Sequence, residues 1–350
     1  MRYGVYVRLL SGLYRSAGKL FLTLALLLGG CATHLEPRSL PESRSLPRDP
    51  VSDAWQPLRD NLPGGEQTSW FDVQDIGPEA LRWRLAMMDT VTTSLDAQYF
   101  IWKDDAVGSL LLERMLQAAD RGVRVRLLLD DSFLSGEDDL MLAVDAHPGV
   151  EMRIFNPFEV RSNSMLLRYV ENLNDNERIN HRMHNKLLIA DSEVAIIGGR
   201  NIADEYFGFD QELNLRTFDV LTTGRVLPQI TASFDSYWNS GWAWPVSIVD
   251  RQQGGREDLD RLRNRLRGNA AVLDRWLAGA DVAPDGLPAR WAGLARRLLP
   301  GAAQLQQDDP HIEAGLPVQA ANHAVGYFSR AGEDVMSISA YLIPSDAVLQ

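Results

Sequence analysis

The sequence predicts an α/β fold in which a mixed sheet is flanked by helices. Apolar residues alternate along 94–102, a helical pattern covers 107–120, and a second apolar run occupies 123–129. A strand, a helix and a strand within about 35 residues are typical of a parallel βαβ unit. The 350 residues are enough for about two domains, and 45% apolar with 23% charged residues is an ordinary globular composition.

The other elements of this first lobe follow the same reasoning. Residues 78–91 are expected to form a helix because Pro78 lies at its first turn, where proline is tolerated. Further expected elements are a helix at 138–146, strands at 150–155, 184–190, 193–198 and 215–222, and a helix at 226–239. Residues 69–245 are therefore expected to form one complete lobe.

The remainder of the chain differs in character. Residues 246–325 are expected to form a helical connector without catalytic residues, since the stretch 251–310 is rich in Arg, Asp, Ala and Leu. Residues 337–343 then resemble 94–101, with serine, alanine and tyrosine in similar positions. This internal repeat favours an incomplete second lobe that begins within 326–350.

Residues 1–30 have the pattern of a targeting segment. A cationic leader precedes an apolar run at 20–28, which is too short for a membrane-spanning helix of about 20 residues. The stretch 28–31 resembles the lipobox of bacterial lipoproteins, so we expect a signal peptide over 1–30, lipidation at Cys31 and a tether over 31–68. A plain signal peptide or a short anchor is the alternative. The resemblance implies a periplasmic position in the bacterial cell envelope, and Ala32 favours the outer membrane.

Charge and cysteine content exclude other classes of protein. The net charge is −12, from 35 basic and 47 acidic residues, which argues against binding of nucleic acid through bulk attraction. One cysteine allows neither an internal disulfide framework nor a cysteine-rich metal site.

One segment carries residues suited to catalysis. If 184–190 is a strand, His184 and Lys186 lie on the same face, because side chains alternate along a strand. An imidazole can act as a nucleophile and an ammonium can hold an anionic oxygen, while glycines allow close backbone approach. The complete pattern is His184, Lys186, Asp191, Gly198, Gly199 and Asn201. These residues fit a phosphodiester site. Zinc bound by His181 and His184 is the weaker alternative, because no further ligand follows at usable spacing.

This pattern, His-x-Lys-x4-Asp followed by Gly-Gly-x-Asn, resembles the phospholipase D superfamily. The stretches 182–186 and 198–207, with 123–131 and 153–158, further resemble the C-type bacterial cardiolipin synthases. Gly199 stands where many members of the superfamily have serine. The resemblance predicts a phospholipase D-like mixed sheet flanked by helices, as one complete lobe plus the start of a second.

The resemblance also implies a two-step transfer without metal or other cofactor. His184 would become a phosphohistidine, Lys186 and Asn201 would hold the phosphate oxygens with Gly198 and Gly199 beside them, and Asp191 would support the site. A second histidine from a partner motif would move the proton. The chain carries one such motif, so a second lobe or a second chain is expected to complete the site. We expect truncation in the second lobe rather than a dimer.

The expected function is therefore a phosphatidyltransferase of the cardiolipin synthase type. Its partners would be phospholipids, with phosphatidylglycerol as the expected substrate, and the membrane reached through the lipidated N-terminus; nucleic acid is not expected. The enzyme alternative is a phospholipase D, phosphodiesterase or nuclease of the same superfamily. The non-enzyme alternative is a catalytically inactive, lipid-anchored binding protein.

Overall fold

The computed structural model describes residues 40–64, 68–172, 180–249, 254–279 and 284–311, together with Gly326 and Arg330. The expected signal peptide over 1–30, Cys31 and the repeat strand at 337–343 lie outside the described residues. All elements below belong to one compact unit.

Within the described residues, the strands form one nine-stranded mixed sheet, in the order β8-β4-β3-β2-β5-β6-β7-β1-β9. The strands are β1 (Ser69–Gln74), β2 (Ser94–Tyr99), β3 (Arg124–Asp130), β4 (Val150–Phe155), β5 (Leu187–Ala190), β6 (Val194–Gly198), β7 (Asp219–Gly224), β8 (Ala243–Pro245) and β9 (Leu299–Gly301). Strands β2, β3 and β4 run parallel, and the other neighbouring pairs are antiparallel. The expected mixed sheet and its parallel βαβ unit are confirmed.

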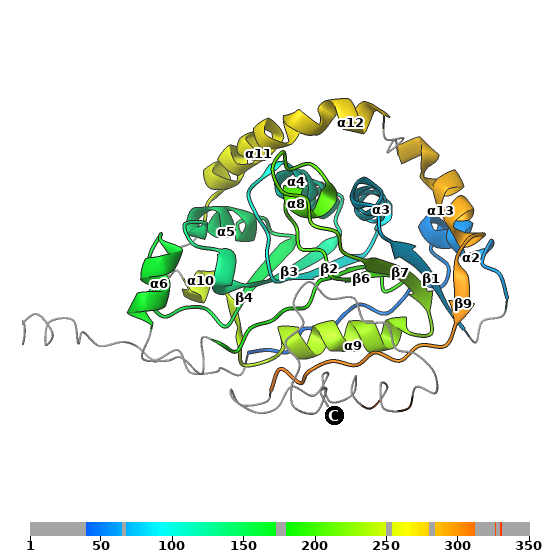
Figure 1. The fold of residues 1–350 in the computed structure, drawn as a ribbon, viewed down its shortest axis with the longest axis horizontal. Helices are drawn as coiled ribbons and strands as arrows, with labels where there is room; N and C mark the ends of the chain where they lie inside the picture. The colour runs from blue at the N-terminus through cyan, green and yellow to red at the C-terminus, as the bar shows by residue number, and fades with distance from the viewer. Residues whose placement is uncertain are drawn as a thin grey trace, which may run out of the picture. The chain divides into compact units, whose positions relative to one another are not determined.

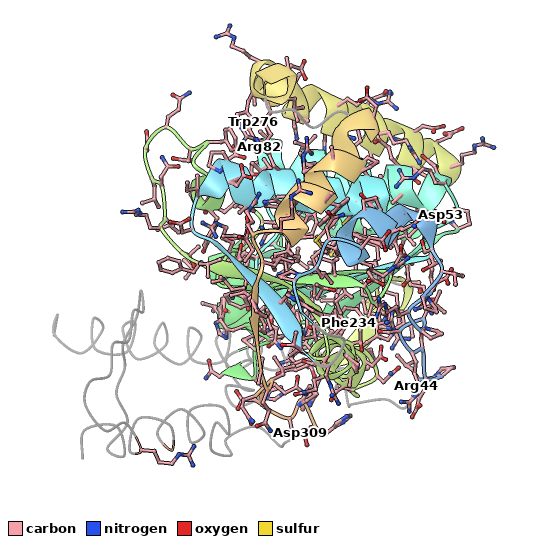
Figure 2. All side chains as sticks on the ribbon, turned by 90° about the vertical axis from the view of Figure 1, so that its right-hand side faces the viewer. Arg44, Asp53, Arg82, Phe234, Trp276 and Asp309 are labelled. Atoms are coloured by element: carbon pink, nitrogen blue, oxygen red, sulfur yellow. The ribbon has the colours of Figure 1, made fainter. Side chains whose placement is uncertain are left out.

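Helices cover both faces of this sheet (Figure 1). The α-helices of the described residues are α2 (Gln56–Arg59), α3 (Gly77–Thr90), α4 (Ala106–Asp120), α5 (Asp138–Asp145), α6 (Met165–Glu171), α8 (Asp204–Phe207), α9 (Leu227–Trp238), α10 (Val246–Val249), α11 (Arg256–Ala270), α12 (Asp274–Gly279) and α13 (Leu287–Ala295). Helix α9 lies on one face; α3, α4, α5 and α8 lie on the other, with α11, α12 and α13 outside them. Figure 2 shows this layering from the side, with Phe234 of α9 below the sheet and Arg82 beside Trp276 above it.

Burial of both faces explains the sequence of the central strands. All six side chains of β2 are buried: Leu95, Ala97 and Tyr99 pack in the core on the α3–α4 side. Asp96, on the other face, is bound by a buried arginine. A strand covered on both faces shows no polar side toward water.

Two of the expected strands begin three or four residues later than their pattern suggests. The strand expected at 184–190 begins at Leu187, so His184 and Lys186 precede it in irregular backbone. The reason is that this backbone is held by side chains: Asp130 accepts the Met183 amide at 2.9 Å. The strand expected at 215–222 is Asp219–Gly224, because the Leu215 amide donates to the Glu205 carbonyl at 2.8 Å and so stays in the preceding loop.

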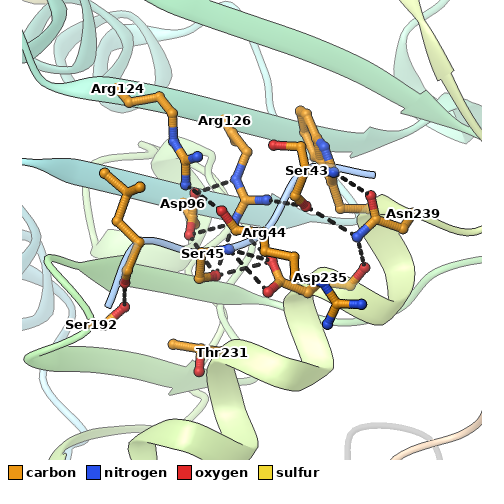
Figure 3. Close-up of polar contacts among 12 residues, drawn as sticks. Ser43, Arg44, Ser45, Asp96, Arg124, Arg126, Ser192, Thr231, Asp235 and Asn239 are labelled. Carbon is orange, nitrogen blue, oxygen red and sulfur yellow. Dashed lines mark hydrogen bonds and ion pairs between the residues drawn. The ribbon is translucent and has the colours of Figure 1, made fainter. Parts of the chain in front are cut away.

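The described part of the expected tether is bound to the lobe (Figure 3). The buried guanidinium of Arg126 on β3 forms a bidentate pair with Asp96 at 2.7 and 2.8 Å and donates to the Ser45 hydroxyl at 2.8 Å. Asp235 of α9 accepts both the Ser45 amide and Arg126, each at 2.9 Å. Residues 43–45 therefore follow the α9 side of the sheet rather than extending freely from it.

The described part of the expected connector packs on the same body. Helix α11 contacts α4 and α5, α13 contacts α2, and β9 extends the sheet by pairing with β1. Helices α11, α12 and α13 lie in the described part of 251–310, and β9 adds a strand that the sequence pattern does not indicate. No helix among the described residues is both long and apolar enough to span a membrane.

Candidate active site

The candidate site lies where the carboxyl ends of β2 and β3 meet the beginning of β5 and the end of β6. His184 belongs to the irregular segment 181–186, and two side chains hold the backbone that precedes it. Asn156, just after β4, donates from Nδ2 to the His181 carbonyl at 2.7 Å. Asp130, at the end of β3, accepts the Met183 amide at 2.9 Å. The backbone before His184 is therefore preorganised by two buried side chains.

The imidazole of His184 is exposed and packs against one aromatic ring. Its centroid lies 4.1 Å from that of Phe100, which follows β2. Desolvation by the surrounding protein, with the positive charges of Lys186 and Arg182, lowers the pKa of His184 from its usual 6.5. The ring is therefore mainly neutral at pH 7, and a neutral imidazole keeps the lone pair that a nucleophile needs.

Lys186 lies directly beside His184. Its Nζ donates to the His184 carbonyl oxygen at 2.5 Å and lies 5.2 Å from the centroid of Phe100. Burial lowers the pKa of Lys186 to about 8, and the charges of Asp130 and Asp219 only partly oppose this effect. The ammonium is thus retained at pH 7 in a desolvated place, where its attraction for an anion is strong.

The two glycines at the end of β6 lie next to this lysine. The Gly198 amide donates to the Lys186 carbonyl at 3.2 Å. A Cβ on Gly198 would lie 2.4 Å from Asp219 Oδ1, and one on Gly199 would lie 2.3 Å from the Thr217 hydroxyl. No larger residue fits without a shift at either position, and the exposed glycine backbone stays open to close approach.

Asn201 connects the glycine turn to the end of β2. Its Oδ1 accepts the Ile101 amide at 3.1 Å, and its Nδ2 donates to the Tyr206 hydroxyl at 2.8 Å. Ile101 follows Phe100, the ring that packs on His184. The structure therefore brings His184, Lys186, Gly198, Gly199 and Asn201 into one connected set.

Asp191 does not join this set, because it lies at the opposite end of β5. Its buried carboxylate accepts the amides of Thr92, Thr93 and Ser94 at 2.7–2.9 Å. It also accepts both threonine hydroxyls and the Trp55 indole N–H. Burial alone would raise the pKa of Asp191, but these hydrogen bonds hold it below its usual range. Asp191 thus fixes the end of β5 to the beginning of β2.

Two acidic residues that are not part of the motif also support the site. Asp219, which β7 places beside Gly198, accepts Arg84 at 2.7 Å and the Arg200 amide at 3.1 Å. Burial favours the neutral form of Asp219, yet Arg84 and Arg200 hold its pKa below the usual range. Asp130 caps the short helix Asp131–Phe133 through the Ser132 amide, in addition to holding Met183. Acidic residues at strand ends are the sequence signal for both.

The arginines next to the motif are also engaged. Arg200 is buried and donates to Asp219 and to the carbonyls of Gln74 and Asp75. Arg182 lies 3.6 Å from Asp130 and donates to the Asn156 carbonyl. In the described part of the chain, no group of three or more His, Cys, Asp or Glu side chains is arranged to hold a metal ion.

The chain is similar to proteins of one family. Residues 85–238 match the family model described as "Cardiolipin synthase, PLD-like domain". "Cardiolipin synthase C" of Escherichia coli is 36% identical over 85% of this chain and 62% of its own length. An uncharacterized protein of Helicobacter pylori is 40% identical over 64% of this chain and 43% of its own length. The chain thus spans 62% and 43% of the length of these two relatives.

Among solved structures, the phospholipase D family member Nuc from Salmonella typhimurium matches 50% of this chain and 97% of its own, at 17% identity and a TM-score of 0.34. The sequence identity to the two relatives named above, 36% and 40%, is about twice the 17% identity to this structure. Residues 85–238 therefore carry a PLD-like domain of the cardiolipin synthase type, and the chain as a whole is similar to the cardiolipin synthases.

Proposed function

We propose that this chain carries the nucleophilic motif of a phosphatidyltransferase of the cardiolipin synthase type, with His184 as the nucleophile. The observation that carries the proposal is the pairing of an exposed imidazole of lowered pKa with the ammonium of Lys186, hydrogen-bonded to the same residue. The alternative ordering of charge, an imidazolium beside a neutral lysine, would leave no nucleophile at pH 7.

In the first step, the lone pair of a His184 ring nitrogen forms an N–P bond to the phosphodiester. The P–O bond to the leaving alcohol breaks, and that alcohol takes a proton from a general acid supplied by the second motif of the superfamily. In the second step, an acceptor hydroxyl attacks phosphorus, returns its proton to the same group and releases His184. With phosphatidylglycerol as donor and acceptor, the products are cardiolipin and glycerol.

The other residues have distinct roles in this proposal. Lys186 and the Asn201 amide hold the non-bridging oxygens, and the glycine turn at 198–199 lets the phosphate approach the backbone. Asp130 and Asn156 are positioning residues, because they bind the backbone before His184. Asp191 supports the site through β5, without touching the substrate.

Phospholipid rather than nucleic acid is the substrate class that the molecule favours. The relatives named cardiolipin synthase support it, and the arginines flanking the motif are bound to Asp219 and Asp130 instead of forming an open cationic groove. We further propose that lipidation at Cys31 attaches the protein to the periplasmic side of the bacterial envelope. A second lobe or a second chain would supply the general acid.

An activated phosphodiester tests the nucleophile without the second motif. In bis(p-nitrophenyl) phosphate the leaving group departs without protonation, so the first step needs only His184 and its oxygen-binding neighbours. We expect a burst of one nitrophenolate per chain and a covalent phosphohistidine that survives alkali. His184→Ala should lose both, whereas His311→Ala, an exposed histidine of the segment after β9, should keep both.

The lipid product is tested separately, with the chain and its longer relatives on phosphatidylglycerol vesicles. Formation of cardiolipin supports transfer, and formation of phosphatidic acid alone supports hydrolysis. A burst that persists in His184→Ala would contradict the proposed nucleophile. Cleavage of DNA in preference to phospholipid would assign the nuclease alternative.

A further inference from the structure

Helix α6 has its polar and apolar sides reversed relative to a surface helix of a water-soluble protein. Such a helix normally turns apolar residues to the core and polar residues to water. In α6, Leu166 is 77% exposed and Val170 is 52% exposed, whereas the guanidinium-bearing Arg168 is buried. Arg168 pairs with Asp131 at 3.1 Å and donates to the Ser162 carbonyl. The charge therefore attaches the helix to the lobe.

The outer face of α6 consists of Met165, Leu166, Leu167 and Val170, each at least 37% exposed. None of these side chains can hydrogen-bond strongly, and none carries a charge. Val160, in the preceding loop, is a further exposed apolar residue. Exposed apolar side chains gathered on one short helix mark an interaction surface, whereas single ones are common. In Figure 1, α6 lies at one end of the fold, far from α12 and α13.

Contacts connect α6 to the candidate active site. Its anchor Asp131 follows Asp130, the residue that holds the Met183 amide next to His184. Phe133 belongs to the same short helix as Asp131, the helix Asp131–Phe133. Its side chain is 40% exposed and packs against Phe100, with the ring centroids 5.3 Å apart. Phe100 in turn packs against His184. A sequence of contacts thus runs from the catalytic imidazole to the apolar rim.

We propose that the outer face of α6 inserts into the acyl region of a phospholipid surface and sets the distance of His184 from the headgroups. The inference rests on the proposed function: a phosphatidyl donor keeps its two acyl chains in the bilayer while its phosphate reaches His184. The site must therefore meet the membrane at its rim. Leucine, methionine and valine without charge suit the acyl side of that boundary, and the continuity with the site favours lipid over a second protein.

A fluorescent probe on the helix tests the insertion without any need for turnover. The chain has one cysteine, so the full chain with Cys31→Ser and Leu166→Cys takes a nitrobenzoxadiazole label at one position. Val272→Cys in the same background is the matched control, because Val272 is 75% exposed and lies in the turn between α11 and α12. Both chains are mixed with phosphatidylethanolamine–phosphatidylglycerol vesicles whose acyl chains carry bromine.

We expect bromolipid quenching at position 166 to exceed that at 272 by at least about twofold, as for a probe within the acyl boundary. Equal quenching at the two positions would overturn the proposal. Shielding of the 166 label from aqueous iodide before vesicles are added would also overturn it, and would assign the face to protein. The same measurement on a His184→Ala chain should give the same quenching, so this result stands apart from the nitrophenolate burst that tests the catalytic proposal.

Discussion

The charge states of His184 and Lys186 are set by their surroundings. Both pKa values are lowered, chiefly by desolvation, and Lys186 further lowers the pKa of its histidine neighbour. The two shifts have opposite effects on the proposed reaction, which needs a neutral imidazole and a charged lysine. The histidine becomes competent at a lower pH, and the lysine loses its charge at a lower pH than an exposed one.

We predict a bell-shaped pH profile for the burst of p-nitrophenolate. The rate should rise through a pKa below 6.5, as His184 loses its proton, and fall through a pKa of about 8, as Lys186 becomes neutral. Lys186→Arg should be slower at pH 7, since a planar guanidinium replaces a compact ammonium, but should lack the alkaline fall. Stopped-flow measurement between pH 5 and 10 checks both. An unchanged alkaline fall in Lys186→Arg would remove Lys186 from this role.

Among single residues, the sequence indicates the proposed nucleophile and its proposed phosphate-binding neighbours more readily than the residues that support them. His184, Lys186 and Asn201 follow from spacing, because the chemistry fixes their types. The support from Asp130 and Asp219 is not predictable in this way, since each binds residues distant in sequence: Asp130 holds Met183, and Asp219 holds Arg84. Spacing places Asp191 with the motif, at the end of the strand expected at 184–190, but only the structure shows that its carboxylate accepts the backbone amides at the beginning of β2.

At the level of elements, β5 transmits this support along its length. One end of the four-residue strand follows His184 and Lys186, and the other end is fixed by Asp191. Pairing with β2 on one side and β6 on the other keeps the strand from sliding. A shift at its far end would move the end next to His184, because a strand packed on both sides is displaced as a unit.

Asp191→Asn is therefore predicted to destabilise the fold by about 2–4 kcal/mol, since an amide offers an N–H where the carboxylate accepts backbone and side-chain donors. Because the folded pKa of Asp191 is lowered, its stabilisation is present above the unfolded value of about 3.9 and is lost as the pH falls through the folded pKa. The difference in unfolding free energy between the native chain and the variant should thus shrink on acidification.

Urea unfolding at pH 7 and at successively lower pH measures this difference. Asp260→Asn is the matched control, because Asp260 is exposed on α11, and it should change the unfolding free energy by less than about 0.5 kcal/mol. A loss in Asp191→Asn no larger than in the control would show that the contacts of Asp191 do not stabilise the strand.

The elements that the sequence pattern misses have a common physical reason. Strands β8 and β9 have three residues each, too few to show alternation, and α6 has its apolar residues on the outside. Contacts with distant residues hold these elements in place. Strand β9 pairs with β1, and α6 is attached by the ion pair between Arg168 and Asp131. The long helices and the parallel strands, whose pattern follows burial, are predicted within one to three residues at each end.

Across the whole molecule, a cluster of tryptophans joins segments that are far apart in sequence. Trp291 of α13 lies 5.0 Å from Trp55 and 5.3 Å from Trp83 of α3, between ring centroids, and donates to the Thr90 hydroxyl at 2.7 Å. Trp55 in turn donates to Asp191. The segment before the sheet, the end of β5 and the helices after the sheet are thus held by one buried cluster.

This cluster predicts that residues 254–301 unfold together with the lobe, although their composition marks them as a connector. Trp291→Ala should lower the free energy of unfolding by about 3–5 kcal/mol, because it leaves a cavity between buried aromatic side chains. Trp276→Ala on α12 should cost less, since Trp276 is only half-buried.

Coupling should also appear in a double-mutant cycle: Trp291→Ala and Asp191→Asn, which share Trp55, should be non-additive by at least about 0.5 kcal/mol. Urea unfolding followed by tryptophan fluorescence and by circular dichroism should show a single coincident transition, and two separate transitions would mean that the helices fold independently of the lobe.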